Sequence, residues 1–391
     1  MTEQEIALCN SVERRADELF AVACEIFDHP ETGHKEFYAC QILESFLESA
    51  GFKIEHGIGG LPTAFRAIYE QGHGGPTIGF MVEYDALRVV NHACGHHLQG
   101  PSGIGAVLAL RDVCAKPVKL VVYGTPDEEG EGGKIDMVQA GVFDGADLIL
   151  AYHSAGSTNI AWENLALQEY SITFHGKKAH AAGAPHKGCS ALDAALLMFH
   201  ALEIMREHCT EGTRIHYSIA EGTGPSNVVP DTCKVSVTLR NTNSNYLQNM
   251  KSRFADIIKG ACLMTGATVD VTMHKQYDSL LSLEAPRKEI YKFMEEIGCE
   301  KINYSHPAGR GSTDVGNVSW VVPTIYFHTY HTDATAHTEE YAADGKTPAA
   351  RRSMITGSQI AGLVALKCVN EPEFLAAMQD EHRKKITEPP M

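Results

Sequence analysis

The order of apolar and polar positions along the chain predicts alternating helices and strands. Amphipathic helices are expected at Glu3–Phe27 and Lys35–Ala50, buried strands at Thr77–Val82, Lys119–Tyr123 and Asp147–Tyr152, and further helices at Pro101–Cys114 and Ile135–Ala140. Strands that alternate with helices are typical of a mostly parallel sheet flanked by helices. The first part of the chain is therefore predicted to be an α/β domain.

The pattern changes in the middle of the chain. There the expected order is strand-helix-strand-strand-helix-strand, which is the order of a ferredoxin-like α+β domain. The segments are Glu169–Phe174, Ala191–His208, Ile215–Ala220, Cys233–Arg240, Asn245–Thr265 and Thr268–Met273. We expect a discontinuous catalytic domain over residues 1–166 and 281–391, interrupted by an inserted domain over residues 167–280. The charged segment Glu371–Met391 is expected to be a solvated helix with a frayed tail.

Composition narrows the class of protein. The chain has 391 residues and a formal net charge of -16, which argues against a nucleic-acid partner or an anionic membrane surface. It shows neither a signal-peptide pattern at Met1–Glu5 nor an apolar run long enough to cross a membrane. The 11 cysteines are scattered without the spacing of a disulfide framework, so we expect reduced thiols and a cytoplasmic protein.

Candidate metal ligands follow the predicted strands. They lie in the segments Asn91–His97, Asp127–Gly130, Tyr152-His153 and Ala336–Glu340. Ligand sites in open α/β sheets form at the carboxyl ends of the strands, so these segments are expected to converge. Thiolate, imidazole and carboxylate together suit zinc or manganese. Glu128 and Glu129 offer one carboxylate for the metal and one for a base, which predicts a metal-dependent hydrolase.

The motifs resemble those of the two-metal aminoacylase/carboxypeptidase superfamily. The most similar branch contains the auxin-conjugate, hippurate and p-aminobenzoyl-glutamate amidohydrolases. The resemblance spans nearly the whole chain, and its motifs are His29–Gly33, Glu83–Leu87, Ala93–His96, Gly124–Gly130, Lys178–Ala182, Asn227–Pro230, Ser312–Ser319 and His337-Thr338. It implies two divalent metal ions per subunit, zinc or manganese.

The resemblance also implies roles for individual residues of the first domain. The metal ligands are Cys94, His96, Glu129, His153 and His337. In relatives, an aspartate stands at the position of Cys94 and bridges the two metals. Glu128 takes the place of the general base that acts on a metal-activated water, and Asp85 orients a ligand. The further histidines His92, His97, His328 and His331 are expected at the surface or behind the ligands, and His97 departs from the acid or amide usual in the family.

For the inserted domain, the resemblance implies dimerisation and closure over the substrate. His180 aligns with a histidine that crosses the interface of a homodimer to stabilise the oxyanion. Asn227 and Arg240 align with residues that bind the substrate carboxylate, and Gly311 and Ser312 with residues that line the pocket. A guanidinium pairs with a carboxylate through two parallel hydrogen bonds, which explains an arginine at such a place.

These features predict an enzyme that cleaves the amide bond of a small N-acyl amino acid or a related conjugate. A dipeptidase or carboxypeptidase on the same scaffold is the first alternative. A catalytically silent protein that binds metal or a small ligand is the second. The third is a thiol enzyme with Cys94 as nucleophile, which would be inactivated by alkylation and indifferent to chelators.

Overall fold

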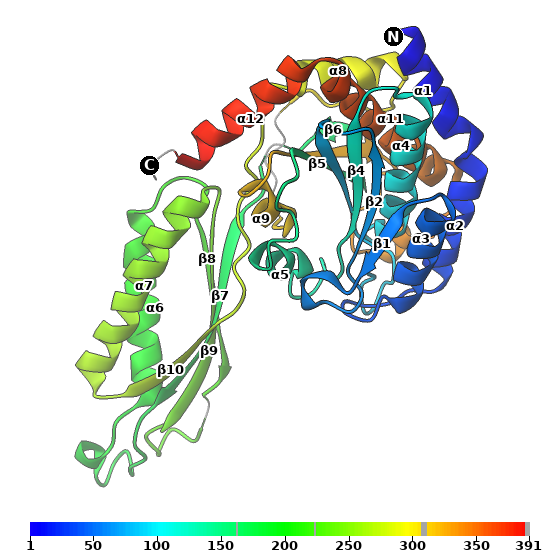
Figure 1. The fold of residues 1–391 in the computed structure, drawn as a ribbon. Coiled ribbons are helices and arrows are strands. Elements are labelled where there is room, and N and C mark those ends of the chain that lie inside the picture. The colour runs from blue at the N-terminus through cyan, green and yellow to red at the C-terminus, as the bar shows by residue number, and fades with distance from the viewer. Residues whose placement is uncertain (162, 223, 306–310, 388–391) are drawn as a thin grey trace. The chain divides into compact units, whose positions relative to one another are not determined.

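The computed structural model describes residues 1–161, 163–222, 224–305 and 311–387 (Figure 1). The described residues form two compact units. The first unit contains those within Met1–Glu163, Leu280–Gly309 and Thr313–Glu388, and the second those within Asn164–Ser279 and Arg310–Ser312. The second unit is thus an insertion between two stretches of the first.

A seven-stranded sheet organises the first unit. Its strands are β1 (Lys53–His56), β2 (Phe65–Gln71), β3 (Thr77–Val82), β4 (Val118–Gly124), β5 (Leu148–Ala155), β6 (Asn159–Ile160) and β11 (Thr324–Tyr330), and their order in the sheet is β1-β2-β4-β3-β5-β11-β6. Neighbours among the four central strands β4, β3, β5 and β11 run parallel, while β1, β2 and β6 pair antiparallel. The predicted α/β fold with a mostly parallel sheet is confirmed.

Alternate side chains of the central strands belong to two different apolar cores. Phe80 of β3 lies in the larger core, and Met81, the next residue, lies in the smaller one. Adjacent strand residues point to opposite faces, so helices cover both sides of the sheet. The helices of this unit are α1 (Glu3–Arg14), α2 (Ala16–Asp28), α3 (Phe37–Ser49), α4 (Gln99–Val113), α5 (Gly133–Gln139), α8 (Arg287–Glu296), α9 (Val315–Ser319), α10 (Glu339–Ala343), α11 (Pro348–Asn370) and α12 (Pro372–Thr387).

Two helical predictions need correction. The single helix expected at Glu3–Phe27 is two helices, α1 and α2, which meet at Arg15. The guanidinium of Arg15 binds the Ser11 side chain and lies 2.8 Å from Asp112 on α4, which fixes the joint. The C-terminal helix α12 is not fully solvated, because Leu375 and Met378 are buried against the larger core. Residues 388–391 of the predicted tail lie outside the described residues.

The second unit contains a four-stranded antiparallel sheet and two helices. Its elements in chain order are β7 (Ala166–His175), α6 (Ala191–Glu207), β8 (Arg214–Glu221), β9 (Thr232–Asn241), α7 (Ser244–Thr265) and β10 (Thr268–Met273). The order in the sheet is β10-β7-β9-β8. Tyr170, Ile172 and Phe174 alternate with more exposed residues on β7 and pack with α6 and α7 in one core. The predicted ferredoxin-like order is confirmed.

Two further predictions concern thiols and membrane spans. All 11 cysteines are free. Among the described residues, no helix combines the length and apolarity that a membrane crossing requires.

Candidate metal centre

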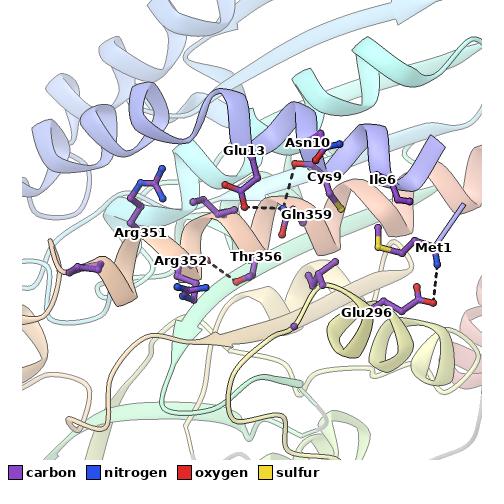
Figure 2. Close-up of a pocket in the computed structure, with 14 residues that line it drawn as sticks. Met1, Ile6, Cys9, Asn10, Glu13, Glu296, Arg351, Arg352, Thr356 and Gln359 are labelled. Atoms are coloured by element: carbon purple, nitrogen blue, oxygen red, sulfur yellow. Dashed lines mark hydrogen bonds and ion pairs between the residues drawn. The ribbon is translucent and has the colours of Figure 1, made fainter. Parts of the chain in front are cut away.

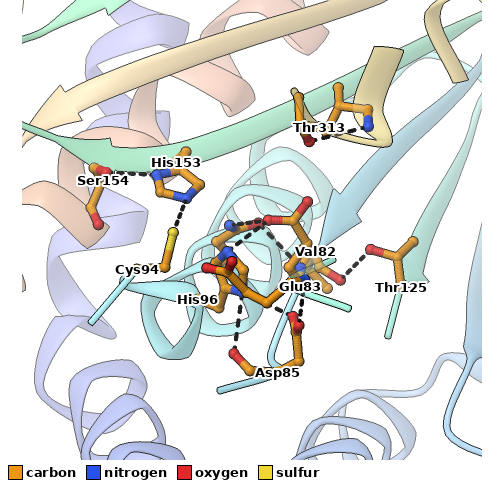
Figure 3. Close-up of polar contacts among 12 residues, drawn as sticks. Val82, Glu83, Asp85, Cys94, His96, Thr125, His153, Ser154 and Thr313 are labelled. Atoms are coloured by element: carbon orange, nitrogen blue, oxygen red, sulfur yellow. Dashed lines mark hydrogen bonds and ion pairs between the residues drawn. The ribbon is translucent and has the colours of Figure 1, made fainter. Parts of the chain in front are cut away.

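The predicted ligands meet at the carboxyl ends of the central strands. Cys94 and His96 lie in the segment after β3, and His153 belongs to β5 (Figure 3). Glu129 follows β4, and His337 lies after β11. The loop between β3 and α4 ends at η2 (His96–Leu98), a single 3-10 turn. Gly95 has a φ of 83°, and a Cβ there would lie 2.2 Å from the Ser154 hydroxyl. A glycine is therefore required between the two ligands of this loop.

Two groups of ligand atoms overlap at Cys94. The first consists of Cys94, His96 and His153, and the second of Cys94, Glu129 and His337; within each, the atoms lie within 4.8 Å of one another. Cys94 Sγ is 3.4 Å from His153 Nε2, and Glu129 Oε1 is 3.1 Å from His337 Nε2. The structure thus brings all five predicted ligands together in two sets that share a thiol.

The histidine rings are held by their other nitrogen. His96 Nδ1 lies 2.9 Å from Asp85 Oδ1, and His153 Nδ1 lies 2.6 Å from the carbonyl oxygen of Ser154. These contacts leave both Nε2 atoms directed at the cluster, as is usual for histidines that bind metals. Asp85 also accepts the backbone N–H of Glu129 at 2.9 Å, so this carboxylate orients two of the predicted ligands.

Two buried atoms of the cluster lack a hydrogen bond. His96 Nε2 has Glu83 Oε2 at 3.3 Å and Glu129 Oε1 has His337 Nε2 at 3.1 Å, but neither contact has the geometry of a hydrogen bond. Buried polar atoms are rarely left unsatisfied, and metal ions bound by these two atoms would satisfy them. Thiolate, imidazole and carboxylate donors also form a set that divalent transition metals accept. The residues therefore fit a two-metal site.

Burial and neighbouring charges together determine the pKa values of these groups. Burial lowers the pKa of His153 to about 4, with help from the charge of His96, so the ring is neutral at pH 7. Burial raises the pKa of the Cys94 thiol. Burial alone would also raise the pKa of Glu129, but the contact with His337 and the charge of His96 lower it to about 2. A neutral imidazole and an ionised carboxylate are the forms that bind a metal.

Glu128, the predicted base, adjoins the ligands without pairing with them. One of its oxygens lies within 4.8 Å of ligand atoms of His96 and Glu129. Its carboxylate makes no hydrogen bond or ion pair with the residues that the structure describes. Burial, followed by the nearby charges of Glu83 and Asp314, raises its pKa well above the usual value for glutamate. A carboxylate with a raised proton affinity suits a general base.

Three further charged residues lie at this site, of which Glu83 and Asp314 were expected only as members of the motifs Glu83–Leu87 and Ser312–Ser319. Lys134 Nζ lies 2.6 Å from Glu83 Oε1 and 2.7 Å from Asp314 Oδ1, and all three side chains are buried. Burial opposes ionisation of Glu83, but the ammonium of Lys134 and the charge of His96 lower its pKa to about 2. Glu83 belongs to a motif that follows a predicted strand, and this position indicated a place at the site. No pattern pointed to Lys134.

The extra histidines are not at the surface. His92, His97 and His331 are buried, and their Nε2 atoms bond to the carbonyl oxygens of Ile26, Gly345 and Asp344. His328 Nδ1 contacts Asn159 Oδ1 at 3.1 Å. Three of these rings therefore bond to the backbone of neighbouring helices and loops, in agreement with the expectation that they lie behind the ligands and not at the surface.

A cavity of about 360 Å³ adjoins the ligands. It is lined by Glu129, Asp127 and the segment Ala86–Val90, and Val89 is 89% exposed there. A cavity of about 520 Å³ lies instead beside α1 and α11, where Cys9, Arg351 and Gln359 line it (Figure 2). None of the predicted ligands borders that second cavity, so of these two cavities the smaller one suits a substrate of the metal centre.

The predicted residues of the second unit fall into two separate groups. His180 is exposed, and its Nδ1 accepts the backbone N–H of Gly183 at 3.0 Å; the adjacent Ala181 donates its N–H to the carbonyl oxygen of Asn227. Arg240 Nη1 donates to Ser312 Oγ at 3.3 Å, and the carbonyl oxygen of Gly311 accepts the N–H of Leu165 at 2.9 Å. His180 therefore lies with Asn227, and Arg240 lies with the segment that contains Ser312.

The two groups lie at opposite ends of β9. Asn227 precedes the strand, which begins at Thr232, whereas Arg240 is its penultimate residue. A strand rises about 3.3 Å per residue, so roughly 25 Å separates the two ends. One substrate carboxylate therefore does not reach Asn227 and Arg240 of the same chain together.

Comparison with known proteins identifies the family. The Xaa-Arg dipeptidase of Mus musculus is 32% identical over 400 residues, which cover 96% of this chain and 91% of the relative. Residues 164–263 match the family model of the peptidase dimerisation domain of M20 proteins. The chain belongs to the M20 peptidase family. The family resemblance and the hydrolase class predicted from the motifs are thus confirmed.

Other M20 proteins agree with this assignment. One of the two p-aminobenzoyl-glutamate hydrolase chains of Escherichia coli (strain K12) is 29% identical over 443 residues, covering 93% of this chain and 91% of the relative. Among solved structures, an aminobenzoyl-glutamate utilization protein from Klebsiella pneumoniae has a TM-score of 0.73 at 20% identity, covering 93% of this chain and 99% of that one. A dinuclear metal-binding M20 peptidase from Bacillus subtilis has a TM-score of 0.70 at 16% identity, covering 90% and 99%. The solved structures establish the likeness of fold.

Proposed function

We propose that the protein is a metal-dependent amidohydrolase of N-acyl amino acids or related conjugates, such as p-aminobenzoyl-glutamate. One observation carries the proposal. Two ligand groups share Cys94, and the unpaired carboxylate of Glu128 lies within reach of both His96 and Glu129. Residues for binding two metals and a separate base are therefore present at one site.

His96 and His153 would hold one metal, Glu129 and His337 would hold the other, and Cys94 belongs to both groups. When bound, such a pair of divalent ions polarises the scissile carbonyl and lowers the pKa of a water. Glu128 takes the proton from the water and delivers it to the leaving nitrogen. Asp85 keeps His96 and Glu129 in orientation throughout. Zinc and manganese are both compatible with this donor set.

We also propose that two subunits complete each active site. His180 and Asn227 lie at the end of the inserted unit opposite Arg240, so one chain does not present all three to one substrate. In a homodimer, one subunit supplies Arg240 for the substrate carboxylate and the partner supplies the other two. The match of residues 164–263 to a dimerisation domain supports this arrangement. A cytoplasmic location, with neither membrane nor nucleic acid as partner, remains the prediction from composition.

A dipeptidase is the second candidate, and a specific finding favours it. The Xaa-Arg dipeptidases of Mus musculus and Homo sapiens are 32% and 31% identical to this chain, each over 96% of its length. A dipeptidase requires a free α-amine on its substrate, whereas an N-acyl hydrolase does not. Asp127, an acidic residue that lines the smaller cavity, has the type of charge that attracts such an amine.

A matched substrate panel separates the two candidates. The purified protein, loaded with zinc or manganese, is assayed on dipeptides and on the same dipeptides with an acetylated amine. Hydrolysis of the acetylated forms and of p-aminobenzoyl-glutamate supports the amidohydrolase. Hydrolysis confined to free amines supports the dipeptidase. No turnover of either set at any metal loading would leave the silent binding protein as the correct account.

A further inference from the structure

A lysine is enclosed next to the proposed base. Lys134 is the second residue of α5, and its side chain has no exposed surface. Its ammonium contacts Glu83 Oε1 at 2.6 Å and Asp314 Oδ1 at 2.7 Å. Lysines are almost never fully buried unless they are paired, and these contacts provide the pairing. None of the roles proposed above uses this residue.

Three carboxylates converge around that ammonium. Glu83, Glu128 and Asp314 each have an oxygen within 4.8 Å of the other two. The second oxygen of Glu83 accepts from the Gln99 amide at 2.7 Å, and that of Asp314 accepts the backbone N–H of Lys134 at 3.0 Å. Both oxygens of these two carboxylates are therefore engaged. Glu128 is the member of the three without a hydrogen bond or ion pair among the described residues.

The arrangement has a clear consequence if the ammonium is removed. Three carboxylates that face one another in a buried place repel strongly unless a cation separates them. Carboxylate oxygens are the preferred ligands of hard divalent cations, and manganese also accepts them. An ion bound there would recruit Glu128 as a ligand. The lysine thus occupies the place in which the carboxylates would otherwise hold a metal.

We propose that Lys134 is a positioning residue that holds Glu83 and Asp314 in the manner of a bound cation, so that the acidic cluster takes up no further metal and Glu128 remains free to act as the base. The inference rests on the role proposed for Glu128. Lys134 would thereby limit the number of ions that the site binds and leave Glu128, of the three carboxylates, free to react.

Metal content and kinetics of Lys134→Met test the proposal. The full-length protein is loaded with manganese, dialysed and analysed for metal per subunit, and its melting temperature verifies folding. The variant is expected to hold one more ion per subunit than the wild type. Its kcat should fall roughly 100-fold or more, the effect of losing a general base, with a much smaller change in KM. Lys346→Met, which removes an exposed lysine paired with Asp28, should match the wild type in both respects.

Two outcomes overturn the proposal. The first is a folded Lys134→Met protein with wild-type metal content and wild-type kcat. The second is a loss of kcat without an additional ion, which would make the lysine a structural residue only. The double variant Lys134→Met/Asp314→Asn, which removes one carboxylate as well, should lose the additional ion again. If the double variant keeps that ion, it is bound elsewhere and the proposal fails.

If Lys134→Met does not fold, Asp314→Asn provides the test. This variant keeps the ammonium but removes one of its two carboxylate partners, so Lys134 is expected to pair with Glu128. The kcat should then fall with metal content unchanged, and a wild-type kcat would overturn the proposal. A wild-type protein without metal or amidase activity would instead refute the proposed function, so the two failures are distinguishable.

Discussion

His337 Nε2 lies 3.1 Å from Glu129 Oε1, although the two residues follow different strands of the sheet. The backbone of His337 has a φ of 68°, which is unusual for a residue other than glycine, and its N–H bonds to the carbonyl of Ala93, next to Cys94. Strained backbone of this kind is maintained where function requires it. The two contacts therefore hold His337 beside Cys94 and Glu129, the other two residues of the second ligand group.

The adjacent carboxylates are predicted to have separable roles. Glu128→Gln should lower kcat by roughly 10²–10⁴-fold while bound metal stays near the wild-type level, because a base is lost and not a ligand. Glu129→Gln should lose metal as well as activity, since Glu129 belongs to the group with Cys94 and His337. Metal analysis beside initial rates measures both effects. Equal metal loss in the two variants would contradict the division of roles.

Much of this site was predictable because local sequence determines it. The strands β3, β4 and β5 are short apolar runs; Cys94, His96 and Glu129 follow such strands, and His153 lies near the carboxyl end of β5. Once the sheet was predicted to be parallel, convergence of the ligands followed from topology. Gly95 lies between Cys94 and His96, and Glu128 is adjacent to Glu129, so both motifs are visible in the sequence.

The remaining features depend on contacts that sequence patterns do not record. The middle of α11, from Ser353 to Leu366, is buried at every position, so it lacks the polar face by which a helix is recognised. Lys134 meets Asp314 across 180 positions of sequence, and no local pattern indicates the pair.

Arg240 is predicted to recognise a substrate carboxylate. Its Nη1 bonds to Ser312, while its Nε is buried without a hydrogen bond. Arg240→Ala should raise KM roughly 10- to 100-fold for substrates with a free carboxylate, the effect of losing a hydrogen bond to a charged group. The corresponding amides should be affected little. Arg253→Ala, an exposed arginine of α7, is the control, and equal effects on acids and amides would make Arg240 structural.

Mixed dimers test whether the site is shared between subunits. His180→Ala and Glu128→Gln should each be nearly inactive, because an oxyanion donor is worth about 2.7–4 kcal/mol and the base is essential. Mixing the two proteins under conditions of subunit exchange should restore part of the activity, since one site of each heterodimer has both residues. Native mass spectrometry verifies the exchange. Baseline activity in verified heterodimers would assign His180 to its own chain.

The free energy of unfolding should fall as the pH rises, because Glu36 becomes ionised. Burial raises the pKa of this carboxyl to about 7 from an ordinary value of 4.5, while bonds from Thr63 and Asp127 oppose the rise. The pKa of Glu36 is higher in the folded state than in the unfolded state, so ionisation of Glu36 lowers the free energy of unfolding. This loss of stability is absent below about pH 4.5 and complete above pH 7. The shift corresponds to about 3 kcal/mol. Urea unfolding at pH 5 and pH 8 should show Glu36→Gln gaining stability relative to the wild type at pH 8, and a constant difference would contradict the prediction.

Metal removal followed by reconstitution tests the central claim most directly. The protein is stripped with a chelator, and hydrolysis of an N-acyl amino acid is measured against the number of zinc or manganese ions restored per subunit. We predict that the stripped protein is inactive, that activity returns with two ions per subunit, and that Cys94→Ala lowers both metal content and rate. Full activity of the stripped protein, combined with inactivation by thiol alkylation, would contradict this account and make Cys94 a nucleophile.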